Sequence, residues 1–131
     1  MTILSHDFPV AKTFGIAAPE KLTVPGFTHP GPMTPTAHPG YRFRPGLLSD
    51  LLGLHQSLAR GQHHDGLSLT CPMGSGIFSL VVETAARLNL NVVQVNGKRR
   101  LEIADLVGHL TVIGGDVLFQ DGPLTLALRH G

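Results

Sequence analysis

The chain has 131 residues and a mass of 13.9 kDa, which is the size of a single domain. Hydrophobic residues make up 42% of the chain and charged residues only 15%, a balance that excludes disorder of the whole chain. The formal net charge of +1 provides no basic field, so non-specific binding to nucleic acid is not expected.

Residues 1–46 form a proline- and glycine-rich segment that holds 8 of the 10 prolines. Because proline lacks a backbone N–H and restricts the residue before it, the run over residues 25–32 cannot sustain a helix or a central strand. The segment also carries spaced aromatic residues: Phe8, Phe14, Phe27, Tyr41 and Phe43. We therefore predict an extended N-terminal arm with turns that packs along the surface of the rest.

Residues 47–131 differ in pattern, and their only prolines are Pro72 and Pro123. Apolar residues at helical spacing predict helices over residues 47–60, 77–88 and 122–130, with a shorter one over 101–107. Short apolar runs predict strands over residues 67–70 and 91–95. Gly114-Gly115 predicts a hairpin that joins residues 110–113 to residues 117–119.

The strand–loop–helix–strand order over residues 67–95 predicts an α/β fold with parallel strands. In such sheets a ligand lies beyond the carboxyl ends of the strands, which here is the loop from Cys71 to Gly76. The loop contains Gly74, Ser75 and Gly76 between a predicted strand and a predicted helix, as a phosphate-binding P-loop does. Taken alone, the pattern favours a glycine turn that closes a strand–helix unit.

Several segments together resemble a family. The P-loop-like window, the helix residues 83–89, the run Ile103-Ala104-Asp105-Leu106-Val107-Gly108 and the segment 119–124 resemble AAA+ ATPases of the MoxR and cobaltochelatase type, a dynein-related AAA lineage. Phe14-Gly15-Ile16 and Tyr41-Arg42-Phe43 resemble the segment that leads into this core. The resemblance implies the N-terminal half of an AAA+ P-loop NTPase domain over residues 47–131. It also implies ATP as ligand, bound by the window Pro72, Met73, Gly74, Ser75, Gly76, Ile77, Phe78 and Ser79.

This window departs from the family in its charge and hydroxyl positions. Ile77 replaces the lysine that neutralises the phosphates, and Phe78 replaces the hydroxyl residue that holds Mg²⁺. The family's acidic Walker B strand has no counterpart before Gly131, so we expect a truncated and degenerate copy. We accordingly expect ATP binding with weak or no hydrolysis. The alternative is a non-catalytic protein that docks onto AAA+ subunits or their partners.

Other candidate sites carry less information. His63-His64-Asp65 contains metal-ligating side chains, but adjacent histidines on a turn rarely bind one ion together, so the sequence favours a solvated polar turn. Cys71 precedes a predicted helix and is either a thiol of lowered pKa or a small strand cap. Lys98-Arg99-Arg100 is either a solvated turn or, by resemblance, a subunit or substrate contact.

Several features bear on location and association. A single cysteine fits a reducing compartment, and neither a signal peptide nor a stretch of about 18 apolar residues is visible, so we expect a soluble, cytoplasmic protein. A helix over residues 122–130 that carries Leu124, Leu126 and Leu128 would lack cover if the sheet is incomplete. We therefore expect self-association or a partner subunit.

Overall fold

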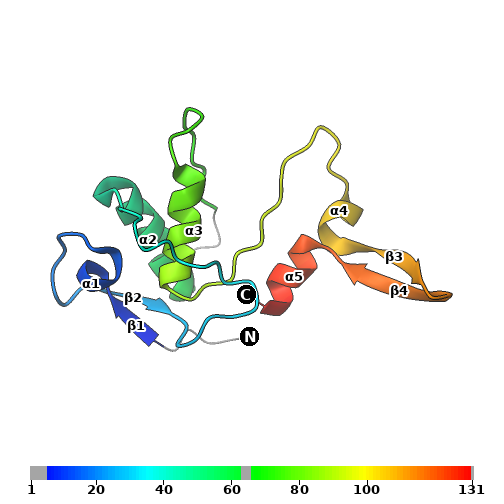
Figure 1. The fold of residues 1–131 in the computed structure, drawn as a ribbon, viewed down its shortest axis with the longest axis horizontal. Coiled ribbons are helices and arrows are strands. Elements are labelled where there is room, and N and C mark those ends of the chain that lie inside the picture. The colour runs from blue at the N-terminus through cyan, green and yellow to red at the C-terminus, as the bar shows by residue number, and fades with distance from the viewer. Residues whose placement is uncertain (1–5, 63–65, 131) are drawn as a thin grey trace.

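The computed structural model describes residues 6–62 and 66–130. The strands of this described part form two separate antiparallel pairs, β1–β2 and β3–β4 (Figure 1). The elements in chain order are β1 (His6–Pro9), α1 (Val10–Phe14), β2 (Thr23–Gly26), α2 (Pro45–Ala59), α3 (Ile77–Arg87), α4 (Ile103–Val107), β3 (Gly108–Ile113), β4 (Asp116–Asp121) and α5 (Pro123–His130).

The N-terminal arm is more regular than predicted, because it contains β1, α1 and β2. Phe8 pairs with Val24 in this ribbon, and Asp7 pairs with Pro25. A two-stranded ribbon tolerates proline, since each strand has an edge where a missing N–H breaks no ladder bond. Side chains of α2 cover the outer edge of β2: His55 Nε2 donates to the Pro25 carbonyl oxygen at 2.7 Å, and Gln56 donates to the Thr23 carbonyl oxygen at 2.7 Å.

The hydrophobic core lies between the arm, α2 and α3. The Phe14 and Phe43 rings meet edge to face with centroids 5.0 Å apart, so the arm supplies core residues as well as surface cover. The core draws on the chain on both sides of residue 46, and the division of the chain at that position stays a prediction. Its buried members are Val10, Phe14, Val24, Phe43, Leu48, Leu52, Leu80 and Leu88.

The second half of the arm is held against the residues that follow α3. Asn89 has a positive φ of 56°, and its side-chain amide nitrogen, Nδ2, donates to the Phe27 carbonyl oxygen at 2.8 Å. Two further bonds tie Met33 to the same segment: its N–H donates to the Asn91 side-chain oxygen, and its carbonyl accepts from Val92 N–H, both at 3.1 Å.

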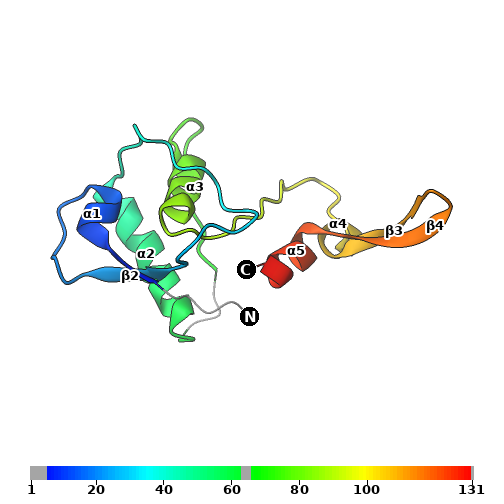
Figure 2. The ribbon, with the colours of Figure 1, turned by 60° about the horizontal axis from the view of Figure 1, so that its bottom comes forward.

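The C-terminal elements extend to one side of the α2–α3 region in both views (Figures 1 and 2). The predicted hairpin is confirmed: Val112 pairs with Val117, and Gly114 and Gly115 form the turn with φ of 63° and 95°. At the other end of the hairpin, Gly122 donates to the Val107 carbonyl oxygen at 2.9 Å. The predicted helices over residues 47–60, 77–88, 101–107 and 122–130 correspond to α2, α3, α4 and α5, with ends shifted by a few residues.

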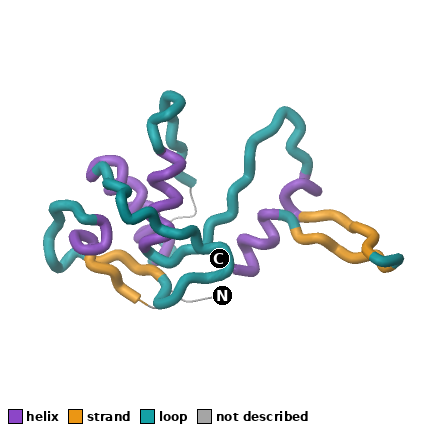
Figure 3. The backbone as a smooth tube through the Cα atoms, viewed as in Figure 1, coloured by secondary structure: helices purple, strands orange, loops and turns teal. Residues whose placement is uncertain are grey.

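The prediction of parallel strands is wrong for the described residues. Residues 67–70 and 91–95 form no strand and run as loop (Figure 3). A parallel strand needs a hydrogen-bonding neighbour and cover on both faces. Here the Val92 amide is already bonded to the arm, and the Val95 side chain is 44% exposed, so neither condition is met. The fold is mixed α/β with small antiparallel sheets.

Within residues 6–62 and 66–130, no helix has both the length and the apolar character needed to cross a membrane.

Candidate functional site

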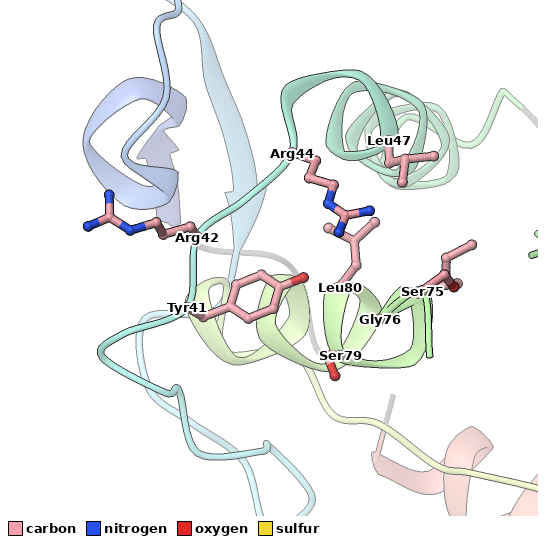
Figure 4. Close-up of a pocket in the computed structure, with 9 residues that line it drawn as sticks. Tyr41, Arg42, Arg44, Leu47, Ser75, Gly76, Ser79 and Leu80 are labelled. Atoms are coloured by element: carbon pink, nitrogen blue, oxygen red, sulfur yellow. The ribbon is translucent and has the colours of Figure 1, made fainter. Parts of the chain in front are cut away.

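A cavity of about 160 Å³ lies where the end of the arm meets the beginnings of α2 and α3 (Figure 4). It joins segments that are distant in sequence, because the arm folds back onto α3. Its lining residues are Tyr41, Arg42, Arg44, Leu47, Ser75, Gly76, Ile77, Ser79 and Leu80.

One wall of the cavity is the glycine loop that precedes α3. Gly74 and Gly76 both have φ of 80°, a backbone conformation that side-chain-bearing residues rarely adopt. Ser75 N–H donates to the Pro72 carbonyl oxygen at 3.3 Å, which closes a turn. Gly76 caps α3 without a side chain, and no acidic residue lies in the first turn of the helix.

The start of α3 consequently presents free hydrogen-bond donors. The first intrahelical acceptor is the Gly76 carbonyl, which receives Leu80 N–H at 3.0 Å. In the described part of the chain, no acceptor is bonded to the backbone N–H groups of Ile77, Phe78 or Ser79. Such donors and the positive end of the helix dipole together favour an anion.

The predicted window divides into residues that face this cavity and residues that do not. Ser75, Gly76, Ile77 and Ser79 line it. The remaining four lie outside the lining, and two of them are largely exposed: Met73 at 103% and Phe78 at 58%. Ile77, at the lysine position of a P-loop, is half-buried and lines the cavity without a charge.

The opposite wall comes from residues 41–44, which sequence reasoning did not assign to the site. The Tyr41 ring and the Arg44 guanidinium are both directed toward α3, whereas the Arg42 guanidinium is directed away from it (Figure 4). The signal in the sequence was the Tyr41-Arg42-Phe43 motif, which resembles the lead-in to the ATPase core. That motif carried no information about which loop it would face.

Burial raises the pKa of Tyr41 above its ordinary value of 10.0; the Glu83 carboxylate acts in the same direction, and the charge of Arg44 opposes it. The phenol therefore stays protonated at neutral pH and can donate a hydrogen bond into the cavity. Its ring meets the Phe43 ring edge to face at a centroid separation of 4.9 Å, which ties it to the core.

A buried carboxylate fixes the arm to α3 beside the cavity. Glu83, only 6% exposed, accepts the His38 N–H with both oxygens, at 2.9 and 3.1 Å. Arg87 donates to the His38 carbonyl oxygen at 3.1 Å, and its guanidinium carbon lies 6.0 Å from the centroid of the Phe43 ring. These contacts hold the wall formed by residues 41–44 at a defined place on the helix.

The chemistry that this lining permits is anion binding. Its polar groups are two arginines, a phenol, two serine hydroxyls and backbone amides, and none of its residues is a carboxylate. The lining thus supplies hydrogen-bond donors for phosphate oxygens but no general base. Because the lining has two arginines and no acid, these residues do not fit a magnesium site.

The other candidates give no competing site. His63-His64-Asp65 lies outside the described residues, and the described ranges hold no cluster of histidine, cysteine or acidic side chains suited to a metal ion. Cys71 is exposed. Lys98 pairs with Asp105 at 2.8 Å, and this contact lowers the pKa of the Asp105 carboxyl.

Comparison with known proteins finds two relatives of MoxR type. The chain is 40% identical over 60 residues to the protein NorQ of Paracoccus denitrificans (strain Pd 1222), a match that covers 46% of this chain and 22% of NorQ. It is 39% identical over 70 residues to the denitrification regulatory protein NirQ of Stutzerimonas stutzeri, covering 53% of this chain and 26% of NirQ.

The chain therefore matches about a quarter of the length of these relatives. No protein-family model matches it, and no solved structure does. What the comparisons show is a distant relation to the AAA+ proteins NorQ and NirQ over about half of the chain.

Proposed function

We propose that this chain binds the phosphate groups of ATP in the cavity at the start of α3 and hydrolyses ATP weakly or not at all. The observation that carries the proposal is the convergence of two donor sets on one cavity. Unbonded amides of α3 form one set, and Tyr41 with Arg44 forms the other. The partial relation to NorQ and NirQ supports ATP as the source of the phosphates.

The size of the cavity limits what it holds. Pockets that enclose a drug-sized ligand have volumes of about 300–1,000 Å³. The cavity here, at about 160 Å³, has room for phosphate groups, while the base and sugar of a nucleotide would lie against the open side. We infer that recognition is directed at the phosphates.

Binding can be measured through Tyr41 itself. The chain has one tyrosine and no tryptophan, so its intrinsic fluorescence reports on the cavity wall alone. Tripolyphosphate does not absorb where tyrosine is excited, and it should change this fluorescence in a saturable manner. ATP, whose base absorbs at that wavelength, is titrated by calorimetry instead.

A negative charge placed in the cavity tests whether the phosphates bind there. Ser79→Asp puts a carboxylate in the lining at the first turn of α3, where a negative charge stabilises a helix, so the fold is retained. Repulsion between like charges about 4 Å apart is about 1 kcal/mol in water and about 4 kcal/mol at an effective dielectric of about 20. We expect the affinity for tripolyphosphate to fall at least about fivefold.

Ser68→Asp is the matched control, because Ser68 is exposed and outside the lining. It changes the net charge equally and should leave the affinity almost unchanged. Equal losses in the two variants, or no binding by the unmodified chain, would contradict the proposal.

A second candidate function is that of a non-catalytic protein that docks onto AAA+ subunits or their partners. One face of the β3–β4 hairpin favours it, because Leu110, Val112, Val117 and Phe119 are 68%, 67%, 64% and 52% exposed. Exposed apolar patches often mark interaction surfaces. Retained docking by a Ser79→Asp variant that no longer binds phosphate would separate this function from the first.

A further inference from the structure

The cavity holds two arginines that differ in what they face. Arg42 and Arg44 both line it, but only the Arg44 guanidinium is directed toward the start of α3 (Figure 4). Within the described residues, Arg44 forms no ion pair and its side chain no hydrogen bond. Its charge acts on Tyr41, where it opposes the rise in pKa that burial and Glu83 cause. The donors of this guanidinium are thus available to a ligand.

The backbone of Arg44 is fixed on both sides. Phe43 before it is buried, and Pro45 after it is the first residue of α2. The Arg44 carbonyl accepts the N–H of Leu48 at 3.1 Å, and the Leu48 side chain is fully buried. The charged group therefore extends from an anchored position, which reduces the entropy that its ordering would cost.

The facing wall lacks the positive charge that a phosphate site normally uses. Ile77 lines the cavity at the position where a P-loop carries lysine. The planar guanidinium of arginine binds two phosphate oxygens at once, which a lysine cannot do with the same geometry. An arginine that enters from the other side of the cavity can therefore replace the charge that Ile77 lacks.

We propose that Arg44 is the residue that neutralises the bound phosphates in this chain, in place of the P-loop lysine. This inference rests on the proposed function and adds a residue and a ligand class to it: the ligand is a polyphosphate held through its oxygens, with the base contributing little. Tripolyphosphate should then bind with an affinity within about tenfold of that of ATP.

Arg44→Gln, with Arg60→Gln as its matched control, tests the assignment. Both arginines are exposed, but Arg60 caps the far end of α2 and lies outside the cavity lining, so the two substitutions remove the same charge from inside and outside the site. A hydrogen-bonded ion is worth about 1.5–3 kcal/mol, so Arg44→Gln should weaken tripolyphosphate binding by about tenfold to a hundredfold. Arg60→Gln should weaken it by less than about threefold, and Arg44→Lys should restore part of the loss.

Titration of Tyr41 without ligand gives a readout that does not depend on affinity. Tyrosinate absorbance reports this single residue, and arginine stays charged throughout the alkaline range. Because the charge of Arg44 lowers the pKa of Tyr41 while Glu83 raises it, Arg44→Gln should raise that pKa further. At a concentration that saturates the unmodified chain but not Arg44→Gln, tripolyphosphate should raise this pKa more in the unmodified chain than in the variant. Circular dichroism at each pH verifies that the chain remains folded.

The outcomes separate the two proposals. Failure of the unmodified chain to bind tripolyphosphate or ATP overturns the proposed function and this inference together. Binding by the unmodified chain with undiminished affinity in Arg44→Gln overturns only the role of Arg44. Equal losses in Arg60→Gln and Arg44→Gln overturn it as well, because they would show a diffuse charge effect.

Discussion

Restoring the two residues that a P-loop carries should raise the affinity for ATP. In Ile77→Lys with Phe78→Thr, an ammonium enters the cavity lining and a hydroxyl returns at the next position. A charge about 4 Å from a phosphate contributes about 1 kcal/mol in water and about 4 kcal/mol at an effective dielectric of about 20. The expected gain in affinity is therefore about fivefold to several hundredfold.

The same change has a modest effect on stability. Full burial of an isoleucine is worth about 1.5–3 kcal/mol, and Ile77 is only half-buried, so its loss should cost about 1 kcal/mol. The methylene stem of the lysine retains part of that contact. Phe78 is 58% exposed, and its removal should cost less.

Calorimetric titration with ATP measures the gain, and Ile77→Met with Phe78→Thr is the control, since methionine matches the length of lysine without its charge. Neither variant nor the unmodified chain should release phosphate in a magnesium-dependent manner, because no carboxylate lines the cavity. Equal ATP affinity in the lysine and methionine variants would refute the reasoning and show that the loop does not present residue 77 to a phosphate.

Three further predictions concern packing. Leu48→Ala should lower the free energy of unfolding by about 2–5 kcal/mol in urea titrations, because Leu48 is fully buried in the core; a loss below about 1 kcal/mol would contradict that placement. Asn89→Gly should cost about 1 kcal/mol for the lost bond to Phe27, and Asn89→Ala about 1 kcal/mol more because φ is 56°; equal losses would argue against a left-handed residue here. Phe119→Lys should reduce self-association in sedimentation, since Phe119 is 52% exposed on an apolar hairpin face, and an unchanged distribution would exclude that face.

The elements that sequence reasoning predicted well are those set by local pattern. Leucines at helical spacing located α2, and Gly114-Gly115 located the β3–β4 turn, because helix periodicity and turn geometry depend on a few neighbouring residues. The strands β1 and β2 were missed, since the prolines of the arm concealed a ribbon whose edges tolerate them.

The parallel sheet was predicted wrongly because strand pairing depends on contacts between segments that are distant in sequence. The order strand–helix–strand leads to parallel pairing only when each strand finds a hydrogen-bonding neighbour and cover on both faces. The segment after α3 instead bonds through Asn91 and Val92 to Met33 in the arm. Nothing in the spacing of residues 67–95 indicates that a segment nearly 60 positions upstream takes those bonds.

In the candidate site, too, the part set by neighbouring residues could be predicted and the part set by distant contacts could not. The loop side of the cavity could be predicted, because Gly74 and Gly76 form a glycine turn before α3. The arginine side could not, because Arg44 reaches the cavity only through the packing of the arm on α3, which the bonds between Glu83 and His38 secure.

The packing of the arm on α3 bears on whether the P-loop-like loop can bind phosphate without its lysine. Ile77 in the lysine position argues against phosphate binding only if the motif must carry its own charge. A phosphate oxygen responds to the position of a positive charge and not to the segment that supplies it. Since Arg44 extends from the opposite wall toward the amides of α3, the charge lost at residue 77 is available across the cavity. The acid needed for hydrolysis has no such replacement in the lining, so we expect binding and turnover to separate in this chain.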